Sequence, residues 1–173
     1  MSMLKDPVSN DDHVQGQQNA EITLVEYGDY QCPFCGHAYL IIKQIQEHFG
    51  LKLRFVFRNF PLTEIHPLAK PAAELTEYAG SEGKFWKMHD LIYENQANLS
   101  LERLVELADS LDLSSTKLKD GPNTFDQKIQ KDFIGGVKSG VNGTPTLFIN
   151  DDRYAGPVEF RYLILAINKT ITS

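Results

Sequence analysis

The feature that most constrains this chain is a pair of cysteines set between a strand pattern and a helix pattern. The 173 residues contain two cysteines, Cys32 and Cys35, which enclose Pro33 and Phe34. Residues 22–27, ITLVEY, come shortly before the pair and are mostly apolar on both faces, which is typical of a buried central strand. The sequence therefore predicts that the cysteines lie where a strand ends and a helix begins.

An amphipathic helix and a second strand are expected directly after the cysteines. Five apolar residues share one stripe at helical spacing, and Gly50 marks the end of the helix: Ala38, Ile41, Ile42, Ile45 and Phe49. Apolar residues then alternate with basic ones, as in a strand: Leu51, Leu53, Phe55 and Phe57 against Lys52, Arg54 and Arg58. Residues 21–58 are thus predicted to form a β–α–β unit.

Helical periodicity dominates residues 66–138, in four pieces separated by glycines. The third piece is expected to begin at Ser100, a good N-cap residue. The stripes are Leu68, Ala72, Leu75 and Ala79; Phe85, Met88 and Ile92; Leu101, Leu104, Val105, Ala108 and Leu111; and, within residues 122–137, Phe125, Ile129 and Phe133. We expect four helices here.

Sheet signals return at the end of the chain. Residues 146–149 form a short apolar run, residues 150–152 favour a tight turn, and residues 153–156 are expected to pair back as a hairpin. Pro157 can occupy the first position of a last helix, which presents Phe160, Leu163, Ile164, Ile167 and Ile171 on one face. The whole order predicts an α/β fold interrupted by helices.

Composition and charge exclude several classes of protein. The formal net charge is −6 and no Lys- or Arg-rich run occurs, so a general nucleic-acid binder is not expected. The first twenty residues are polar and lack the features of a secretory signal, and no stretch approaches the ~18 apolar residues of a spanning helix. We expect no membrane interaction and a cytoplasmic protein, or a periplasmic one if an export signal has been removed.

The spacing of the cysteines indicates redox chemistry. A bridge that encloses two residues restricts the unfolded chain little, so a structural disulfide does not account for the pair. At a helix start, unpaired N–H groups and the helix dipole stabilise a thiolate, which favours Cys32 as the attacking group and Cys35 as the group that resolves the mixed disulfide. Pro33 suits a first helical turn, and Phe34 could set the redox potential or contact a partner.

Three alternative roles for the pair stay open. Cys32, Cys35 and His37 could bind zinc, but structural zinc sites take four ligands and the chain has no second cysteine pair. Two buried thiols could be inert. The pair could also be a sensor that is oxidised without turnover. We expect no metal and no organic cofactor.

Three segments together resemble the DsbA-like branch of the thioredoxin superfamily. LVEYGDYQCPFC is similar to its active-site segment, FPLTEIHPLAKPAAELTEYAGSEGKFWKMHDLIYE to its helical insertion, and GVNGTPTLFIN to its late loop and strand. The resemblance covers roughly residues 20–170. It implies a thioredoxin-like domain at 20–65 and 139–173, a helical insertion at 66–138 after the first β–α–β unit, and a lead-in at 1–19.

The resemblance also implies roles for individual residues. Pro145 would follow a cis peptide bond beside the cysteines, the alternative being a trans proline that starts a strand. The Thr144 backbone would pair with an extended substrate segment. Glu26, six residues before Cys32, would be a buried acid that accepts the proton of Cys35, the alternative being a strand glutamate that faces solvent.

Two histidines are further candidates for the site. His37 could favour nearby thiolates if it is protonated, or could be an ordinary surface residue of the helix. His66 could face the active-site groove or cap the first inserted helix. The sequence does not distinguish these alternatives.

The predicted function is thiol–disulfide exchange with protein substrates, coupled to a thiol system that donates or accepts electrons. The direction stays open between oxidase, isomerase and reductase, because DsbA-like oxidases work outside the cytoplasm and no export signal is seen. Two alternatives are a sensor or binding module without turnover and a glutathione-linked transferase or isomerase. The second cysteine weighs against the transferase.

Overall fold

A central mixed sheet organises the molecule. The computed structural model describes residues 2–114 and 125–173. In these residues the sheet has five strands in the order β1-β3-β2-β4-β5. β2 and β3 are parallel, and the other neighbouring pairs are antiparallel. The bounds are His13–Gln15 for β1, Ile22–Gly28 for β2, Leu53–Asn59 for β3, Thr146–Ile149 for β4 and Asp152–Arg153 for β5.

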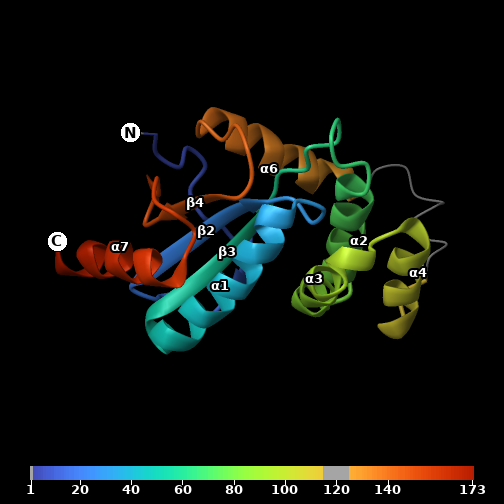
Figure 1. Ribbon diagram of the computed structural model, residues 1–173, viewed down its shortest axis with the longest axis horizontal. Helices are drawn as coiled ribbons and strands as arrows, with labels where there is room; N and C mark the ends of the chain where they lie inside the picture. The colour runs from blue at the N-terminus through green and yellow to red at the C-terminus, as the bar shows by residue number, and fades with distance from the viewer. Residues whose placement is uncertain (1, 115–124) are drawn as a thin grey trace.

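Two helices pack on one face of this sheet (Figure 1). Helix α1, Pro33–Phe49, comes after β2, carries the cysteine pair at its start and ends at Gly50, as predicted. Helix α7, Phe160–Thr172, packs against α1. A short 3-10 turn, η1, Gly50–Lys52, precedes β3, so this strand begins two residues later than Leu51. The predicted β–α–β unit is confirmed.

Helix α6, Asp126–Lys138, covers the opposite face. Its Phe133 stacks on Phe60 with ring centroids 4.3 Å apart, above a smaller core to which Val25, Tyr27 and Phe148 belong. Side chains alternate between the two faces of a strand, so Glu26 lies on the α1 side while its neighbour Tyr27 lies on the α6 side. The two faces therefore have different cores and different polar residues.

The remaining helices gather beside the sheet, at the right in Figure 1, and α6 runs from them across its top. They are α2, Ala69–Ser81; α3, Phe85–Glu94; the 3-10 turn η2, Gln96–Asn98; and α4, Leu101–Ser110. Ser100 caps α4 by accepting a hydrogen bond from the Arg103 N–H at 3.0 Å, as predicted. The start of the fourth predicted helix, before residue 125, lies outside the described residues.

The C-terminal segment departs from the prediction in two places. The strand paired with β4 is Asp152–Arg153 rather than residues 153–156, and α7 begins at Phe160 rather than at Pro157. The Pro157 carbonyl accepts the Glu159 N–H at 2.9 Å and the Tyr154 hydroxyl at 2.7 Å. This tight turn uses the carbonyl that a helix starting at Pro157 would have directed to residue 161.

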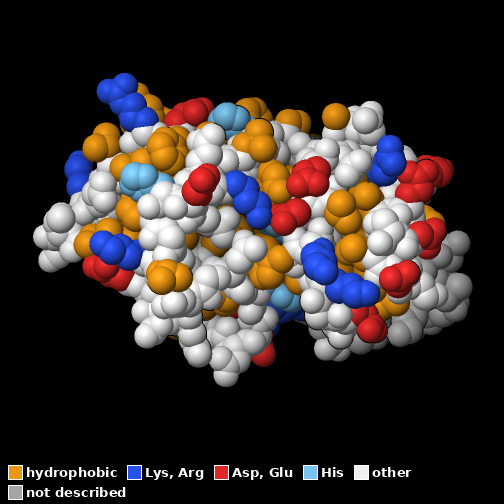
Figure 2. All heavy atoms as spheres, turned by 90° about the horizontal axis from the view of Figure 1, so that it is seen from below, with side chains coloured by type: hydrophobic (Ala, Val, Ile, Leu, Met, Phe, Trp, Pro, Cys, Tyr) orange, Lys and Arg blue, Asp and Glu red, His pale blue; other side chains and the backbone are white. Residues whose placement is uncertain are grey.

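The N-terminal segment is tied to the sheet. It supplies β1, whose His13 pairs with Phe57, and Met3 forms an isolated bridge with Asp152 at the other edge. The sequence predicts only an extended or poorly ordered lead-in here. Figure 2 shows hydrophobic side chains in small groups among charged ones on the face seen from below. No helix in residues 2–114 or 125–173 is long and apolar enough to cross a membrane.

Candidate redox site

The two cysteines lie at the first turn of α1. Cys32 is the N-cap residue and Pro33 is the first residue of the helix. The Cys32 carbonyl accepts the N–H groups of Cys35 at 3.0 Å and of Gly36 at 3.1 Å, so the first turn of the helix is closed around the pair. Both thiols are free, and Cys32 is 3% exposed while Cys35 is fully buried.

The surroundings of Cys32 favour its thiolate. The hydrogen bond from the Cys35 thiol, together with the backbone N–H groups of Phe34 and Cys35 at the helix start, outweighs burial and lowers the pKa of Cys32 to about 5. The Cys32 thiol donates to the Thr144 carbonyl oxygen at 3.6 Å, a contact that favours the neutral thiol but does not reverse the shift. At neutral pH this cysteine is therefore mostly ionised.

Cys35 has the opposite character, although it is one helical turn away. Burial first, and then its hydrogen bond to the Cys32 sulfur and the charge of Glu26, raise the pKa of Cys35 well above its usual value. The backbone N–H of Asp29, which donates to the Cys35 Sγ at 3.4 Å, acts in the opposite sense. The site thus holds one ready nucleophile and one protonated thiol in contact.

Glu26 is a buried carboxyl group beside the pair. Its side chain lines a small void with Tyr39, Ile42 and His89, and its Oε1 has no hydrogen-bond partner among the described residues. Burial, reinforced by the nearby charge of Cys32, raises the pKa of Glu26 to about 8. Near neutral pH the group can therefore both hold and release a proton.

The loop before β4 forms the other wall of the site. The peptide bond between Thr144 and Pro145 is cis, and both residues are half-buried. Pro33 is exposed on the helix side of the same site, and Phe34 has 74% of its surface accessible. Cys32 thus lies beside the Thr144 backbone, and an exposed aromatic side chain follows it two residues later.

The two candidate histidines have different surroundings. His66 lies in the loop before α2, and its Nδ1 is 2.7 Å from Oδ2 of Asp29, a buried residue of the turn that leads to Cys32. His37 pairs with Glu159, before α7, at 3.0 Å, and each side chain is 52% exposed. The fold joins His66, but not His37, to the turn that carries the cysteines.

One contact of the site had no sequence signal strong enough to identify it. Gln96, in η2, donates from Nε2 to the carbonyls of Tyr30 at 2.8 Å and Cys32 at 2.9 Å. Gly36 leaves room for this amide, because a Cβ there would lie 2.1 Å from the Gln96 Oε1. Gln96 therefore links η2 to residues 29–32, which we call the redox turn, although a glutamine in a sequence gives no sign of such a role.

A metal has few donors at this site. Among residues 2–114 and 125–173, no group of three or more His, Cys, Asp or Glu side chains could hold an ion. Cys32, Cys35 and His37, the set that the sequence offered for zinc, therefore do not form such a group.

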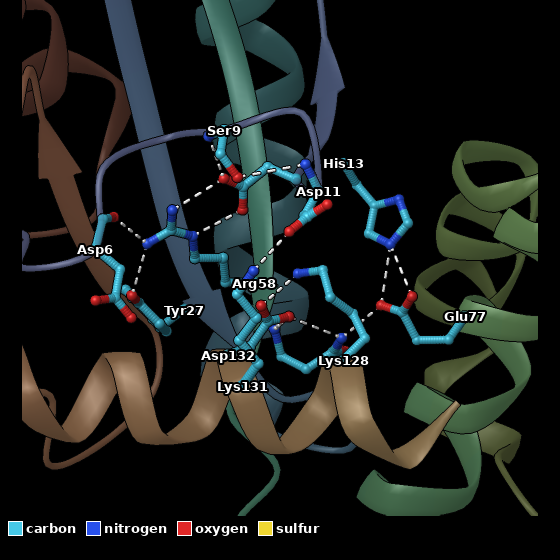
Figure 3. Close-up of polar contacts among 12 residues, drawn as sticks. Asp6, Ser9, Asp11, His13, Tyr27, Arg58, Glu77, Lys128, Lys131 and Asp132 are labelled. Atoms are coloured by element: carbon cyan, nitrogen blue, oxygen red, sulfur yellow. Dashed lines mark hydrogen bonds and ion pairs between the residues drawn. The ribbon is translucent and has the colours of Figure 1, made fainter. Parts of the chain in front are cut away.

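A second polar cluster lies on the α6 face of the sheet (Figure 3). Arg58 of β3 donates to both carboxylate oxygens of Asp12, at 2.8 and 2.9 Å, and to the carbonyls of Asp6 and Pro7 and the hydroxyl of Tyr27. Burial opposes ionisation of Asp12, yet its hydrogen bonds with Arg58 and Ser9 lower its pKa overall. Every nitrogen of the guanidinium has a partner.

The same cluster continues toward α2. The carboxylate of Asp132 accepts the backbone N–H of Asn59 at 3.0 Å and pairs with Lys128, one turn earlier on α6. Glu77 accepts the Asn59 amide at 2.8 Å and lies 2.9 Å from the Nε2 of His13. Figure 3 shows these side chains converging from the N-terminal segment, the sheet, α2 and α6.

Comparison with known proteins agrees with this geometry. A family model described as Thioredoxin matches residues 8–169. Similar curated proteins include the Na(+)/H(+) antiporter NhaA 1 of Salinispora arenicola, 39% identical over 170 residues, and NhaA of Herminiimonas arsenicoxydans, 34% identical over 163 residues. The matches cover 96% and 92% of this chain but 25% and 26% of those proteins. The chain spans about a quarter of the length of these relatives.

Several solved structures share the whole fold. Oxidised BdbD from Bacillus subtilis superposes with a TM-score of 0.85 at 26% identity and covers 99% of each chain. The catalytic domain of Proteus mirabilis ScsC gives 0.83 at 20% identity, over 98% of this chain and 93% of the other. Wolbachia pipientis alpha-DsbA1 gives 0.80 at 21% identity, over 98% and 94%. The predicted thioredoxin-like fold is confirmed.

Proposed function

We propose that this chain, which belongs to the thioredoxin family and resembles its DsbA-like branch, exchanges disulfides with protein substrates through Cys32 and Cys35. The observation that carries the proposal is that the pKa values of two adjacent thiols are shifted in opposite directions. The pKa of Cys32 is lowered to about 5 while that of Cys35 is raised. This division suits a nucleophile and a resolving thiol.

In the reducing direction, the Cys32 thiolate attacks one sulfur of a substrate disulfide. A Cys32–substrate disulfide forms, and the other substrate sulfur leaves as a thiolate. Cys35 then attacks the Cys32 sulfur, the Cys32–Cys35 bond forms, and the second substrate thiolate leaves. The substrate disulfide is reduced and the enzyme dithiol is oxidised. In the oxidising direction the same steps run in reverse.

Glu26 is proposed to take the Cys35 proton before the second attack. A thiol that is fully buried ionises only if a base lies close by. The carboxylate of Glu26 can serve as that base, because its pKa of about 8 makes it a much better proton acceptor than an ordinary glutamate. Its unpartnered Oε1 supports this role.

The Thr144–Pro145 loop is proposed to receive the substrate. The Thr144 carbonyl lies beside the Cys32 thiol, and a substrate segment that pairs with this backbone as an added strand would bring its sulfur to Cys32. The exposed Phe34 ring offers apolar contact to such a segment. These features suit an extended polypeptide better than a small thiol.

The direction of exchange depends on the compartment and on the partner thiol system. The cytoplasmic location expected from the sequence stays a prediction, as does the division into a thioredoxin-like domain and a helical insertion. In a reducing compartment the resting form is the dithiol, which favours reduction or isomerisation of clients.

A second candidate is a redox module that acts without turnover. The relatives named Na(+)/H(+) antiporters favour it, since a segment similar to more than nine-tenths of this chain is there part of a much longer protein. Such a module would switch between dithiol and disulfide and change its contacts with a partner.

An activity assay separates the two candidates. Reduction of insulin by dithiothreitol and refolding of scrambled ribonuclease are measured with the wild-type chain and with Cys32→Ser and Cys35→Ser. We expect turnover that Cys32→Ser abolishes. A titratable pair without turnover would support the module, and full activity of Cys32→Ser would refute the redox assignment.

A redox titration against glutathione then assigns the direction. A midpoint reduction potential of about −120 mV is characteristic of a strong oxidase, and one of about −270 mV is characteristic of a thioredoxin-like reductase. The stabilised Cys32 thiolate favours the dithiol form and therefore predicts a midpoint less negative than that of thioredoxin.

A further inference from the structure

One peptide group in the turn before Cys32 forms hydrogen bonds on both sides, to helix α1 and to the loop after β3. The unit that joins Gly28 to Asp29 directs its N–H to the Cys35 Sγ at 3.4 Å, and its carbonyl accepts the Phe60 N–H at 2.8 Å. A backbone N–H aimed at a sulfur stabilises the thiolate more than the neutral thiol, because a hydrogen bond to a charged acceptor is stronger. The position of this unit therefore bears on how easily Cys35 attacks.

The carboxylate of Asp29 fixes the turn that contains this unit. It is buried, its Oδ1 accepts the Gln31 N–H at 2.8 Å, and its Oδ2 accepts the Leu62 N–H at 2.9 Å. The Asp29 carbonyl in turn accepts the Cys32 N–H at 3.1 Å. A single residue thus contacts both cysteines through its backbone and the loop after β3 through its side chain.

His66 completes the shell around this carboxylate. Its Nδ1 donates to Oδ2 at 2.7 Å, and its side chain is 17% exposed whereas that of Asp29 is fully buried. A hydrogen bond within the loop also fixes the backbone of His66, because its N–H donates to the Leu62 carbonyl at 2.8 Å. His66 therefore supplies the side-chain donor by which the loop holds the Asp29 carboxylate.

We propose that His66 is a positioning residue for the resolving step: by holding Asp29 it keeps the Asp29 N–H directed at the Cys35 sulfur while that sulfur attacks Cys32. This inference rests on the proposed function, since it assigns a role within the exchange cycle. Among the described residues, His66 has no hydrogen bond to either cysteine, and its side chain is assigned to act through Asp29. It affects the second step of the cycle, in which the Asp29 N–H meets the Cys35 sulfur. In the first step Asp29 meets only the backbone N–H of Cys32 and not the attacking sulfur, so that step is left unchanged.

The reaction with 5,5′-dithiobis(2-nitrobenzoate) separates the two steps. Cys32 attacks the reagent and releases one thionitrobenzoate, leaving a mixed disulfide. Cys35 then attacks Cys32, which forms the Cys32–Cys35 disulfide and releases a second thionitrobenzoate. Stopped-flow absorbance gives a rate for each release, and Cys35→Ser identifies the first because it lacks the second.

Two variants at His66 and one control variant at another histidine test this role. His66→Leu removes the donor, His66→Asn retains an N–H near the position of Nδ1, and His48→Gln, at an exposed histidine near the end of α1, is the control. We expect His66→Leu to slow the second release about tenfold, consistent with loss of a hydrogen bond to a charged group. The first release should be unchanged, and His66→Asn should restore most of the rate.

Each contrary outcome has a distinct meaning. If the second release of His66→Leu lies within about twofold of the control, the positioning role is refuted. Equal slowing of both releases, without recovery in His66→Asn, would also refute it, because that pattern indicates general loss of structure. A wild-type chain without a second release would instead refute the proposed function.

Discussion

The two faces of the central sheet treat buried charge in opposite ways. On the α6 face, Arg58 is surrounded by acceptors and its Asp12 partner carries two of its hydrogen bonds (Figure 3). On the α1 face, the Oε1 of Glu26 has no partner in the described part of the chain. The residues come from adjacent parallel strands, so the difference arises from what packs over each face.

The difference distinguishes buried charges that stabilise the fold from buried groups that can exchange a proton. A buried ion pair whose hydrogen bonds are all satisfied holds its segments in place and keeps its ionisation state. A buried carboxyl without a partner changes its pKa instead, and so can exchange a proton near neutral pH. Glu26, a group of the second kind, lies beside the cysteines, whereas the Arg58–Asp12 pair lies on the other face of the sheet.

The largest expected effect on stability comes from removing the arginine that pairs with a buried carboxylate on the α6 face. Arg58→Met leaves the Asp12 carboxylate buried without its partner, so we expect a loss of about 3–5 kcal/mol in the free energy of unfolding, measured in urea. The pKa of the Cys32 thiol, followed by thiolate absorbance, should stay near its wild-type value. The double variant Arg58→Met with Asp12→Leu should recover much of the loss. A loss no greater than that of an exposed arginine would contradict the structural role.

Glu26→Gln should act in the opposite direction on stability. The pKa of Glu26 is about 8 in the fold and 4.5 in the unfolded chain, so folding takes up a proton between these values. This proton uptake costs nothing below pH 4.5, and the cost grows as pH rises until it levels off above about 8. Glu26→Gln should therefore gain up to about 3 kcal/mol at pH 7 and lose this pH dependence.

Stability of Glu26→Gln is best compared with wild type in the disulfide form, where the thiols do not titrate. The Cys32 charge is absent in that form and burial alone raises the pKa of Glu26, so the gain should be smaller there than in the dithiol form. The same variant should slow the second thionitrobenzoate release, because Cys35 loses its base. A wild-type stability that stays flat between about pH 5 and about 8, with the rate unchanged, would show that Glu26 is an ordinary carboxyl.

A smaller effect is expected at the contact between the redox turn and η2. Gln96→Leu removes the two hydrogen bonds to the Tyr30 and Cys32 carbonyls, which should cost about 1–3 kcal/mol of unfolding free energy. Because the Cys32 carbonyl keeps its bonds from the Cys35 and Gly36 N–H groups, the pKa of Cys32 should change little. A pronounced rise of that pKa would mean that Gln96 tunes the thiol itself.

The smallest effect is expected at an exposed ion pair on the α6 face, Lys131 with Asp11, which we call the rim. Lys131 pairs with Asp11 at 2.6 Å, but both side chains are largely exposed. Solvent screens such a pair, so Lys131→Gln should leave the urea midpoint unchanged at physiological salt. A clear shift would show that the rim, and not only buried Arg58, holds the N-terminal segment.

Local patterns predict much of this molecule. The strand before Cys32, the stripe of α1 that ends at Gly50 and the Ser100 cap of α4 depend on neighbours within a few residues. So does the placement of the cysteine pair at a helix start. The predicted start of α7 is three residues too early, because the turn around Pro157 uses a hydrogen bond from the Tyr154 side chain that no spacing reveals.

The contacts that give the two faces their character depend on long-range packing. Arg58 meets Asp12 across 46 residues of sequence, His66 meets Asp29 across 37, and Thr144 approaches Cys32 across 112. Short-range periodicity carries no information on which side chains meet after the helices pack on the sheet. The cysteine pair and its helix were thus determined by the sequence alone. Tertiary structure decided which buried charges are paired, because only packing sets their desolvation and their partners.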